Sequence, residues 1–189
     1  MCIRDSIKPN KLERNMKIVA IIQASLGSIR LPGKVLKKIG NKNLIEIILE
    51  RLSHSNEINE IVVATSVDSK NDVLQKFVES LNYNCFRGSE KDVLERYFMC
   101  AERFNADAVV RVTGDCPLVD AELVDDLIKQ FKKSNVDYFS NVEPSTFPDG
   151  LDVEIISFDA LKKAHLIARS EYDREHVTPY IYKNKKKFY

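Results

Sequence analysis

Short apolar runs alternate with longer amphipathic segments along most of the chain. Residues 17–22, 60–66 and 108–113 are almost continuously apolar, which is typical of strands buried on both faces. Shorter strands are predicted at residues 83–87, 137–141 and 152–156. Apolar residues three or four positions apart predict helices over residues 44–52, 71–81, 92–104, 121–133 and 158–169. This alternation indicates an α/β domain with a mostly parallel sheet covered by helices on both faces.

In open sheets of this class, ligands bind at the carboxyl ends of the strands. The three strongest strands end at Ile22, Ser66 and Thr113. The turns that follow these residues are therefore the first places to look for a functional site.

The loop after the first strand, residues 23–34, reads QASLGSIRLPGK. Gly27 and Ser28 form a small-residue turn whose backbone N–H groups can approach an anion closely. Arg30 and Lys34 add two cations that suit phosphate oxygens. The loop matches neither the dinucleotide fingerprint nor the P-loop pattern. From the residues alone, a triphosphate-binding loop and a surface loop with a Pro-Gly turn remain equal alternatives.

A second turn, residues 111–120, reads RVTGDCPLVD and follows the strand at residues 108–113. Asp115 comes directly after Gly114, and a carboxylate there can hold Mg²⁺ together with substrate phosphates. Pro117 stiffens the turn. Asp115 could instead cap a helix, but Asp120 fits that role better because it directly precedes the predicted helix. We therefore predict Asp120 as the N-cap and Asp115 as the functional carboxylate.

Two further segments combine turn residues with polar side chains. In residues 87–97, Gly88 and Ser89 are candidates to meet a base or ribose, although Ser89 as N-cap with Asp92 three residues later is an equally simple structural explanation. Residues 147–154 read FPDGLDVE, a strong turn signal with three acidic residues beside it. The three acidic residues are Asp149, Asp152 and Glu154. They could bind sugar hydroxyls or a metal, or they could belong to an exposed turn. Asp152 and Glu154 are expected to share one face of a strand.

Charge and composition narrow the classes of function. Lys plus Arg is 29 and Asp plus Glu is 28, so the net charge of +1 gives no general attraction for nucleic acid or membrane. No apolar run approaches the roughly 20 residues that span a bilayer. The four cysteines form no CxxC pair, so we expect free thiols in a cytoplasmic protein. Residues 1–15 are polar and aperiodic, and we expect a non-native or disordered leader before a single domain at residues 16–189.

Six segments in register resemble a known family: QASLGSIRLPGK, IVVATS, RGSEKDVLERY, VRVTGDCPL, FPDGLDVE and REHVTPYIY. They resemble the cytidylyltransferases of the spore coat polysaccharide biosynthesis F type, which are similar to CMP-Kdo and CMP-sialic acid synthetases. The resemblance runs from Met16 to the end of the chain. It implies a Rossmann-like nucleotide-diphospho-sugar transferase fold with three α/β/α layers and a mixed seven-stranded sheet. It also implies a Mg²⁺-dependent reaction of CTP with a sugar acid that yields a CMP-sugar and pyrophosphate.

By this resemblance, each motif receives an expected role. The nucleotide would be held by Gln23, Ala24, Gly27, Ser28, Arg30, Lys34, Gly88, Ser89 and Gly114. Arg30, Lys34 and Asp115 would be catalytic, with Asp115 as the metal ligand. Asp149, Asp152 and Glu154 would lie on the sugar side. The related synthetases are commonly dimers, so a homodimer is compatible with the resemblance.

The chain departs from the family pattern in two places. Ser25 stands where the family usually has an arginine, which removes a phosphate-facing cation. The family also continues into a segment resembling TVDTPEDL, whose aspartate would be a second metal ligand, beyond Tyr189. We therefore expect a domain incomplete at its C-terminus with little activity. The alternatives are a nucleotidyltransferase for another nucleotide or acceptor, and a non-catalytic nucleotide-binding homologue.

Overall fold

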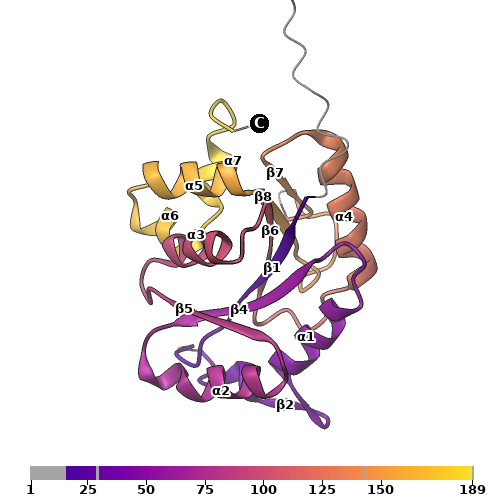
Figure 1. The fold of residues 1–189 in the computed structure, drawn as a ribbon, viewed down its shortest axis with the longest axis vertical. Helices are drawn as coiled ribbons and strands as arrows, with labels where there is room; N and C mark the ends of the chain where they lie inside the picture. The colour runs from indigo at the N-terminus through magenta and orange to yellow at the C-terminus, as the bar shows by residue number, and fades with distance from the viewer. Residues whose placement is uncertain (1–15, 29, 143, 189) are drawn as a thin grey trace, which may run out of the picture.

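The computed structural model describes residues 16–28, 30–142 and 144–188, so the predicted leader lies outside the described residues. Its main sheet has six strands in the order β5-β4-β1-β6-β8-β7 (Figure 1). The strands are β1 (Ile18–Gln23), β4 (Glu60–Ser66), β5 (Asn84–Gly88), β6 (Ala108–Thr113), β7 (Tyr138–Ser140) and β8 (Glu154–Ser157). The first four strands are mutually parallel, whereas β8 runs antiparallel to both β6 and β7. The prediction of a mostly parallel mixed sheet is confirmed.

Helices cover both faces of the sheet, and each face has its own apolar core (Figure 1). One core contains buried residues of α1 (Leu44–Ser53), α2 (Asp72–Ser80) and α4 (Ala121–Ser134). The other contains those of α3 (Val93–Arg103), α5 (Phe158–Ile167) and α7 (Pro179–Lys183). The α6 helix (Glu171–His176) packs against α3.

The central strand β1 divides its side chains between these two cores. Ile18, Ala20 and Ile22 belong to the first core, and Val19 and Ile21 belong to the second. All five side chains are fully buried. Burying a large aliphatic side chain contributes about 1.5–3 kcal/mol, so β1 is a major source of stability and holds its carboxyl end firmly in place.

The structure also departs from the sequence-based predictions. Within the described residues the main sheet has six strands rather than seven, and a separate antiparallel ribbon joins β2 (Lys38–Ile39) to β3 (Lys42–Asn43). Two short 3₁₀ helices, η2 (Lys34–Leu36) and η3 (Ser69–Asn71), were not predicted. The strand expected at residues 152–156 begins only at Glu154. Asp152 and Glu154 therefore do not share a strand face, and that expectation was wrong.

Side-chain caps fix where two helices begin near the carboxyl edge of the sheet. Asp120 accepts a hydrogen bond from the Leu123 backbone N–H, so its prediction as the N-cap of α4 is confirmed. Asp92, and not Ser89, is the N-cap of α3, because its carboxylate accepts from Glu95 N–H at 2.8 Å. The Ser89 hydroxyl instead accepts from Asp92 N–H at 3.1 Å, which tightens the turn before the helix.

Among the described residues, no helix combines the length and the apolar character needed to cross a bilayer.

Candidate active site

A cavity of about 880 Å³ opens at the carboxyl edge of the parallel strands. Gln23, Ser66 and Thr113, the last residues of β1, β4 and β6, all line it. The three turns singled out in the sequence therefore meet at one pocket, as expected for an open α/β sheet. Eight of the predicted site residues line this pocket: Gln23, Ala24, Gly27, Ser28, Arg30, Lys34, Gly114 and Asp115.

The loop after β1 is held by hydrogen bonds to its neighbours. Ala24 N–H donates to the Ala64 carbonyl at 3.2 Å, and Gly33 N–H donates back to the Leu26 carbonyl at 3.1 Å. The Leu26 N–H donates to Asn71 Oδ1 at 2.9 Å. These bonds hold the loop in shape beside β4, so its backbone and its cations face the pocket without further ordering.

Lys34 and Asp115 form the central ion pair of the pocket. Although 81 residues separate them, Lys34 Nζ lies 2.6 Å from Asp115 Oδ2. The β6 turn can approach β1 this closely because residue 114 is glycine: its N–H donates to the Gln23 carbonyl at 2.8 Å. A side-chain carbon at this position would lie 2.9 Å from that same oxygen.

The Asp115 carboxyl group is held in its charged form. Partial burial alone would raise its pKa, but hydrogen bonds from Lys34 and Thr113 lower it below the ordinary value for aspartate. Its side chain is 47% exposed, so an incoming ligand can reach the carboxylate. An ionised carboxylate next to a cation can bind a metal ion while that cation turns to a phosphate.

The surroundings of Asp115 fit Mg²⁺ better than a metal enclosed by protein ligands. Within the described part of the chain, no cluster of three or more His, Cys, Asp or Glu side chains could hold a metal ion. Mg²⁺ usually keeps several waters and binds one or two carboxylates together with substrate phosphates. Burial first, and then the charges of Asp149, Glu154 and Asp115, raise the pKa of Asp152.

Five predicted site residues do not line the pocket: Gly88, Ser89, Asp149, Asp152 and Glu154. Gly88 ends β5, where its carbonyl accepts from Val67 N–H at 2.9 Å. Glu154 is 6% exposed and accepts hydrogen bonds from Arg111 and from the Tyr138 hydroxyl. The surroundings of Glu154 are those of a structural residue beneath the pocket, and its expected contact with a sugar has no geometric support.

Sequence reasoning missed the buried arginines of the pocket. Arg96 in α3 and Arg111 in β6 both line it, and each has an Nε atom without a hydrogen-bond partner among the described residues. Gln23 Oε1, also buried, lacks a partner in the same way. Because buried polar groups normally have hydrogen-bond partners, three unpaired polar atoms around one pocket indicate that the pocket binds a polar ligand. Arg111 was overlooked because it lies within an otherwise apolar strand.

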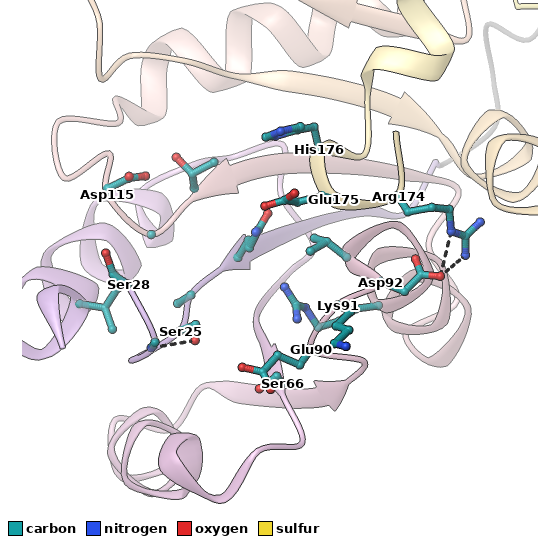
Figure 2. A pocket seen from close by; sticks show the side chains of 18 of the residues that line it. Ser25, Ser28, Ser66, Glu90, Lys91, Asp92, Asp115, Arg174, Glu175 and His176 are labelled. Carbon is teal, nitrogen blue, oxygen red and sulfur yellow. Dashed lines mark hydrogen bonds and ion pairs between the residues drawn. The ribbon is translucent and has the colours of Figure 1, made fainter. Parts of the chain in front are cut away.

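The helix α6 forms the wall of the pocket that faces the loop after β1. Arg174 anchors it by donating from Nε to Asp92 Oδ2 at 2.8 Å and from Nη1 to the His165 carbonyl at 2.7 Å. This contact places Glu175 and His176 across the pocket from Ser25 (Figure 2). The sequence analysis assigned no functional role to Arg174, Glu175 or His176. The signal that could have revealed α6 is Ser170, whose hydroxyl caps the helix by accepting from Asp173 N–H.

The cysteines of the described residues are free thiols, as predicted for Cys85, Cys100 and Cys116, whereas Cys2 lies outside them. Burial raises the pKa of Cys116, the thiol beside Asp115, and so disfavours its nucleophilic thiolate form.

Comparison with known proteins assigns the family. Residues 19–189 match the sequence model of the protein family described as Cytidylyltransferase. The chain belongs to the cytidylyltransferase family. It is therefore a CTP-dependent nucleotidyltransferase, and the expected enzyme class is confirmed.

Two relatives match most of this cytidylyltransferase. The uncharacterized protein MJ1063 of Methanocaldococcus jannaschii is 46% identical over 169 residues, which cover 89% of this chain and 68% of that protein. The spore coat polysaccharide biosynthesis protein SpsF of Bacillus subtilis is 35% identical over 169 residues, which cover 87% of this chain and 69% of SpsF.

Solved structures agree with this assignment. A cytidylyltransferase from Leptospira borgpetersenii has a TM-score of 0.87 at 36% identity, covering 92% of this chain and 74% of that one. A CMP:2-keto-3-deoxy-manno-octonic acid synthetase solved with CTP has a TM-score of 0.72 at 18% identity, covering 90% and 86% of the two chains. The second likeness confirms the Rossmann-like fold.

Proposed function

We propose that this cytidylyltransferase transfers the CMP group of CTP to a sugar acid, with Mg²⁺ held by Asp115. The observation that carries the proposal is the Lys34–Asp115 pair, 2.6 Å apart, at the edge of the sheet where the loop after β1 faces the pocket. This arrangement puts a metal-binding carboxylate and two phosphate-binding cations, Arg30 and Lys34, beside one another. A nucleoside triphosphate and Mg²⁺ need that combination.

The chain's own groups orient the reacting phosphates. Lys34 turns from Asp115 to the phosphates as they enter, and Arg30 presents its guanidinium to the same oxygens. Bound at Asp115, Mg²⁺ supplies positive charge against the charge that develops during transfer. An acceptor oxygen forms a bond to the α-phosphorus while the bond from that phosphorus to the bridging oxygen breaks. Pyrophosphate leaves, the hydroxyl proton passes to water, and no protein nucleophile takes part.

The α6 side of the pocket suits an acidic acceptor. Arg111, Arg169 and Arg174 line it, but Arg111 pairs with Glu154 and Arg174 with Asp92. Arg169 is exposed, and among the described residues its side chain makes one long hydrogen bond, to the Ala168 carbonyl at 3.4 Å. Arg169 is therefore the guanidinium best placed to take the carboxylate of a sugar acid. A relative from Hydrogenovibrio crunogenus, 34% identical over 69% of this chain, is named 3-deoxy-manno-octulosonate cytidylyltransferase.

The test measures pyrophosphate release from CTP and Mg²⁺ with a panel of acceptors: sugar acids, the corresponding neutral sugars and sugar phosphates. We expect release only with sugar acids, and a fall of about a hundredfold or more in Asp115→Ala. Asp126→Ala is the matched control, since Asp126 is an exposed carboxylate on α4. Release with neutral sugars alone would contradict the acceptor class, and equal release from Asp115→Ala would contradict the metal ligand.

Arg169→Met tests the acceptor side separately. We expect a higher KM for the sugar acid and an unchanged KM for CTP, because the substitution removes a cation from the α6 wall alone. A change confined to the KM of CTP would contradict the proposed position of the acceptor.

A further inference from the structure

Ser25 shapes the nucleotide loop but brings no charge to it. Its hydroxyl accepts a hydrogen bond from Gly27 N–H at 3.1 Å (Figure 2). It also donates to Asn71 Oδ1 at 3.4 Å. Because Ser25 is uncharged, this side of the loop has no cation of its own. A triphosphate bound here would therefore lack one favourable charge, unless another segment of the chain supplies it.

The 3₁₀ helix η3 (Ser69–Asn71) docks against the same side of the loop. Asn71 is fully buried: its Oδ1 accepts from Leu26 N–H at 2.9 Å, and its Nδ2 donates to Ser66 Oγ at 2.8 Å. These two bonds hold η3 against both the loop and the end of β4. The position of the residue before Asn71 is therefore well determined.

That residue is Lys70, whose ammonium group lies against the backbone of Gly27. A side-chain carbon built at Gly27 would lie 3.0 Å from Lys70 Cε and 3.1 Å from Lys70 Nζ. Gly27 and its neighbour Ser25 both line the pocket. Lys70 thus places a cation beside the part of the loop that carries none, and glycine at position 27 leaves the space for it.

Two carboxylates hold the ammonium group of Lys70. Its Nζ lies 3.1 Å from Asp68 Oδ2 and also pairs with Glu90. Glu90 lines the pocket and lies on the same side of it as Ser25 and Ser66 (Figure 2). The Lys70 side chain is 39% exposed, so its flexible stem can exchange one carboxylate for a phosphate oxygen with little rearrangement.

We propose that Lys70 supplies the phosphate-binding cation that Ser25 does not. This inference rests on the proposed function and deepens it, because it assigns a nucleotide contact to a segment outside the nucleotide loop. The ammonium group leaves Glu90 and meets the triphosphate, while Asn71 keeps η3 in place. Position 25 and position 70 are then two alternative sources of one charge.

The test compares CTP affinity, measured by titration calorimetry with Mg²⁺, in the wild-type protein and four variants. Lys70→Met should weaken CTP binding about tenfold, as expected for one partly exposed charged hydrogen bond. Ser25→Arg should restore affinity in the Lys70→Met background and add less in the wild type, because residues that share one role are not additive. Lys76→Met is the matched control: Lys76 is an exposed lysine on the neighbouring helix α2, whereas Lys70 contacts Gly27 and Glu90 at the edge of the pocket.

Two further variants separate phosphate contact from simple neutralisation of Glu90. If Lys70 only masks Glu90, the Lys70→Met/Glu90→Gln protein will bind CTP as tightly as Glu90→Gln alone, and that result would overturn the proposal. We expect the double variant to bind several-fold more weakly. Loss of affinity that Ser25→Arg fails to restore would also overturn it.

The outcome separates this proposal from the proposed function. If the wild type and Lys70→Met bind CTP equally well, only the role of Lys70 is overturned, and the proposed function stands. No CTP binding by a folded wild-type protein would overturn the proposed function and the role of Lys70 together. Circular dichroism of each variant checks that it is folded.

Discussion

At the residue scale, Glu154 shows how burial changes the meaning of an acidic residue. It shares a buried network with Arg111 and Tyr138, and the pKa of Tyr138 is raised by burial and by the nearby Glu154 charge. Breaking a buried ion pair leaves an unpaired charge and typically costs about 3–5 kcal/mol. We therefore expect Glu154→Ala to lower the free energy of unfolding by this amount in urea denaturation.

The control for this substitution is Asp149→Ala, in the exposed turn before β8, which should change stability little. Unchanged stability of Glu154→Ala, with a raised KM for the acceptor, would contradict the structural role and favour the sugar contact expected from the sequence.

Asp125 in α4 makes stability depend on pH. It accepts hydrogen bonds from Ser55, from Asn56 N–H at 2.9 Å and from Glu57 N–H at 3.2 Å. Burial opposes ionisation, but these hydrogen bonds outweigh it and lower the pKa of Asp125. The stabilisation is present above the unfolded-state pKa, near 4 for an aspartate, and is lost as the pH falls through the lower folded-state value.

We therefore expect Asp125→Asn to lower the free energy of unfolding at pH 7 by about 1–3 kcal/mol and to flatten its decline in acid. Chemical denaturation between pH 7 and pH 2 measures both effects. Asp126→Asn, at the exposed neighbouring position, is the control and should retain the wild-type profile. A parallel decline in wild type and Asp125→Asn would contradict the prediction.

Both residues of the central ion pair were predicted from the sequence as site residues, whereas the two arginines deep in the pocket were not. Lys34 and Asp115 were predictable because each follows a strongly apolar parallel strand, and such strands end at one edge of the sheet. Arg111 lies inside such a strand, where its charge marks neither a turn nor a cap. Its role depends on Glu154, which is 43 residues away and lies on an antiparallel neighbour.

At the element scale, one arginine anchors α6 to its neighbours beside the pocket. Arg174 joins it to Asp92, the N-cap of α3, and to the carbonyl of His165 in α5. The described residues of α6 include none that is fully buried, so the helix has little apolar packing of its own. Segments of this kind open locally at low free energy.

We expect Arg174→Met to speed hydrogen exchange across residues 169–177 while exchange in the sheet stays slow. Exchange measured by mass spectrometry would reveal this difference. Arg103→Met, at an exposed position at the end of α3, is the matched control. Faster exchange throughout the whole sheet would contradict a local role for Arg174.

Length explains which elements were predictable. The strands β4 and β6 begin at the predicted residues because they are almost continuous apolar runs. The helix α4 does so because apolar periodicity and the Asp120 cap act together. The α6 and α7 helices have six and five residues, fewer than two turns, so no periodicity can develop. The order of the strands could not be predicted from the sequence either, because no local pattern specifies that β8 pairs with β6.

At the scale of the whole molecule, nucleotide binding should stabilise the fold. A ligand at about 100 times its Kd adds about 2.7 kcal/mol to the free energy of unfolding. For a chain of this size, we expect CTP with Mg²⁺ to raise the Tm by roughly 5–10 °C. Lys34→Met should reduce this shift because it removes a cation from the phosphate loop.

Thermal denaturation with CTP, UTP, GTP and ATP at equal concentrations measures both the size and the selectivity of the effect. Lys129→Met serves as the control, since Lys129 is exposed on α4 away from the pocket. Equal shifts with all four nucleotides would contradict the preference for cytosine that the family implies.

The place of β1 in the sheet also bears on how the protein is made. As the chain leaves the ribosome, β1 appears first, yet its partners β4 and β6 follow only after about 40 and 90 further residues. Until Thr113 has emerged, one edge of a strand with five apolar residues out of six stays open to other chains, a state prone to aggregation. Early synthesis is therefore the stage at which this cytidylyltransferase has most need of a chaperone.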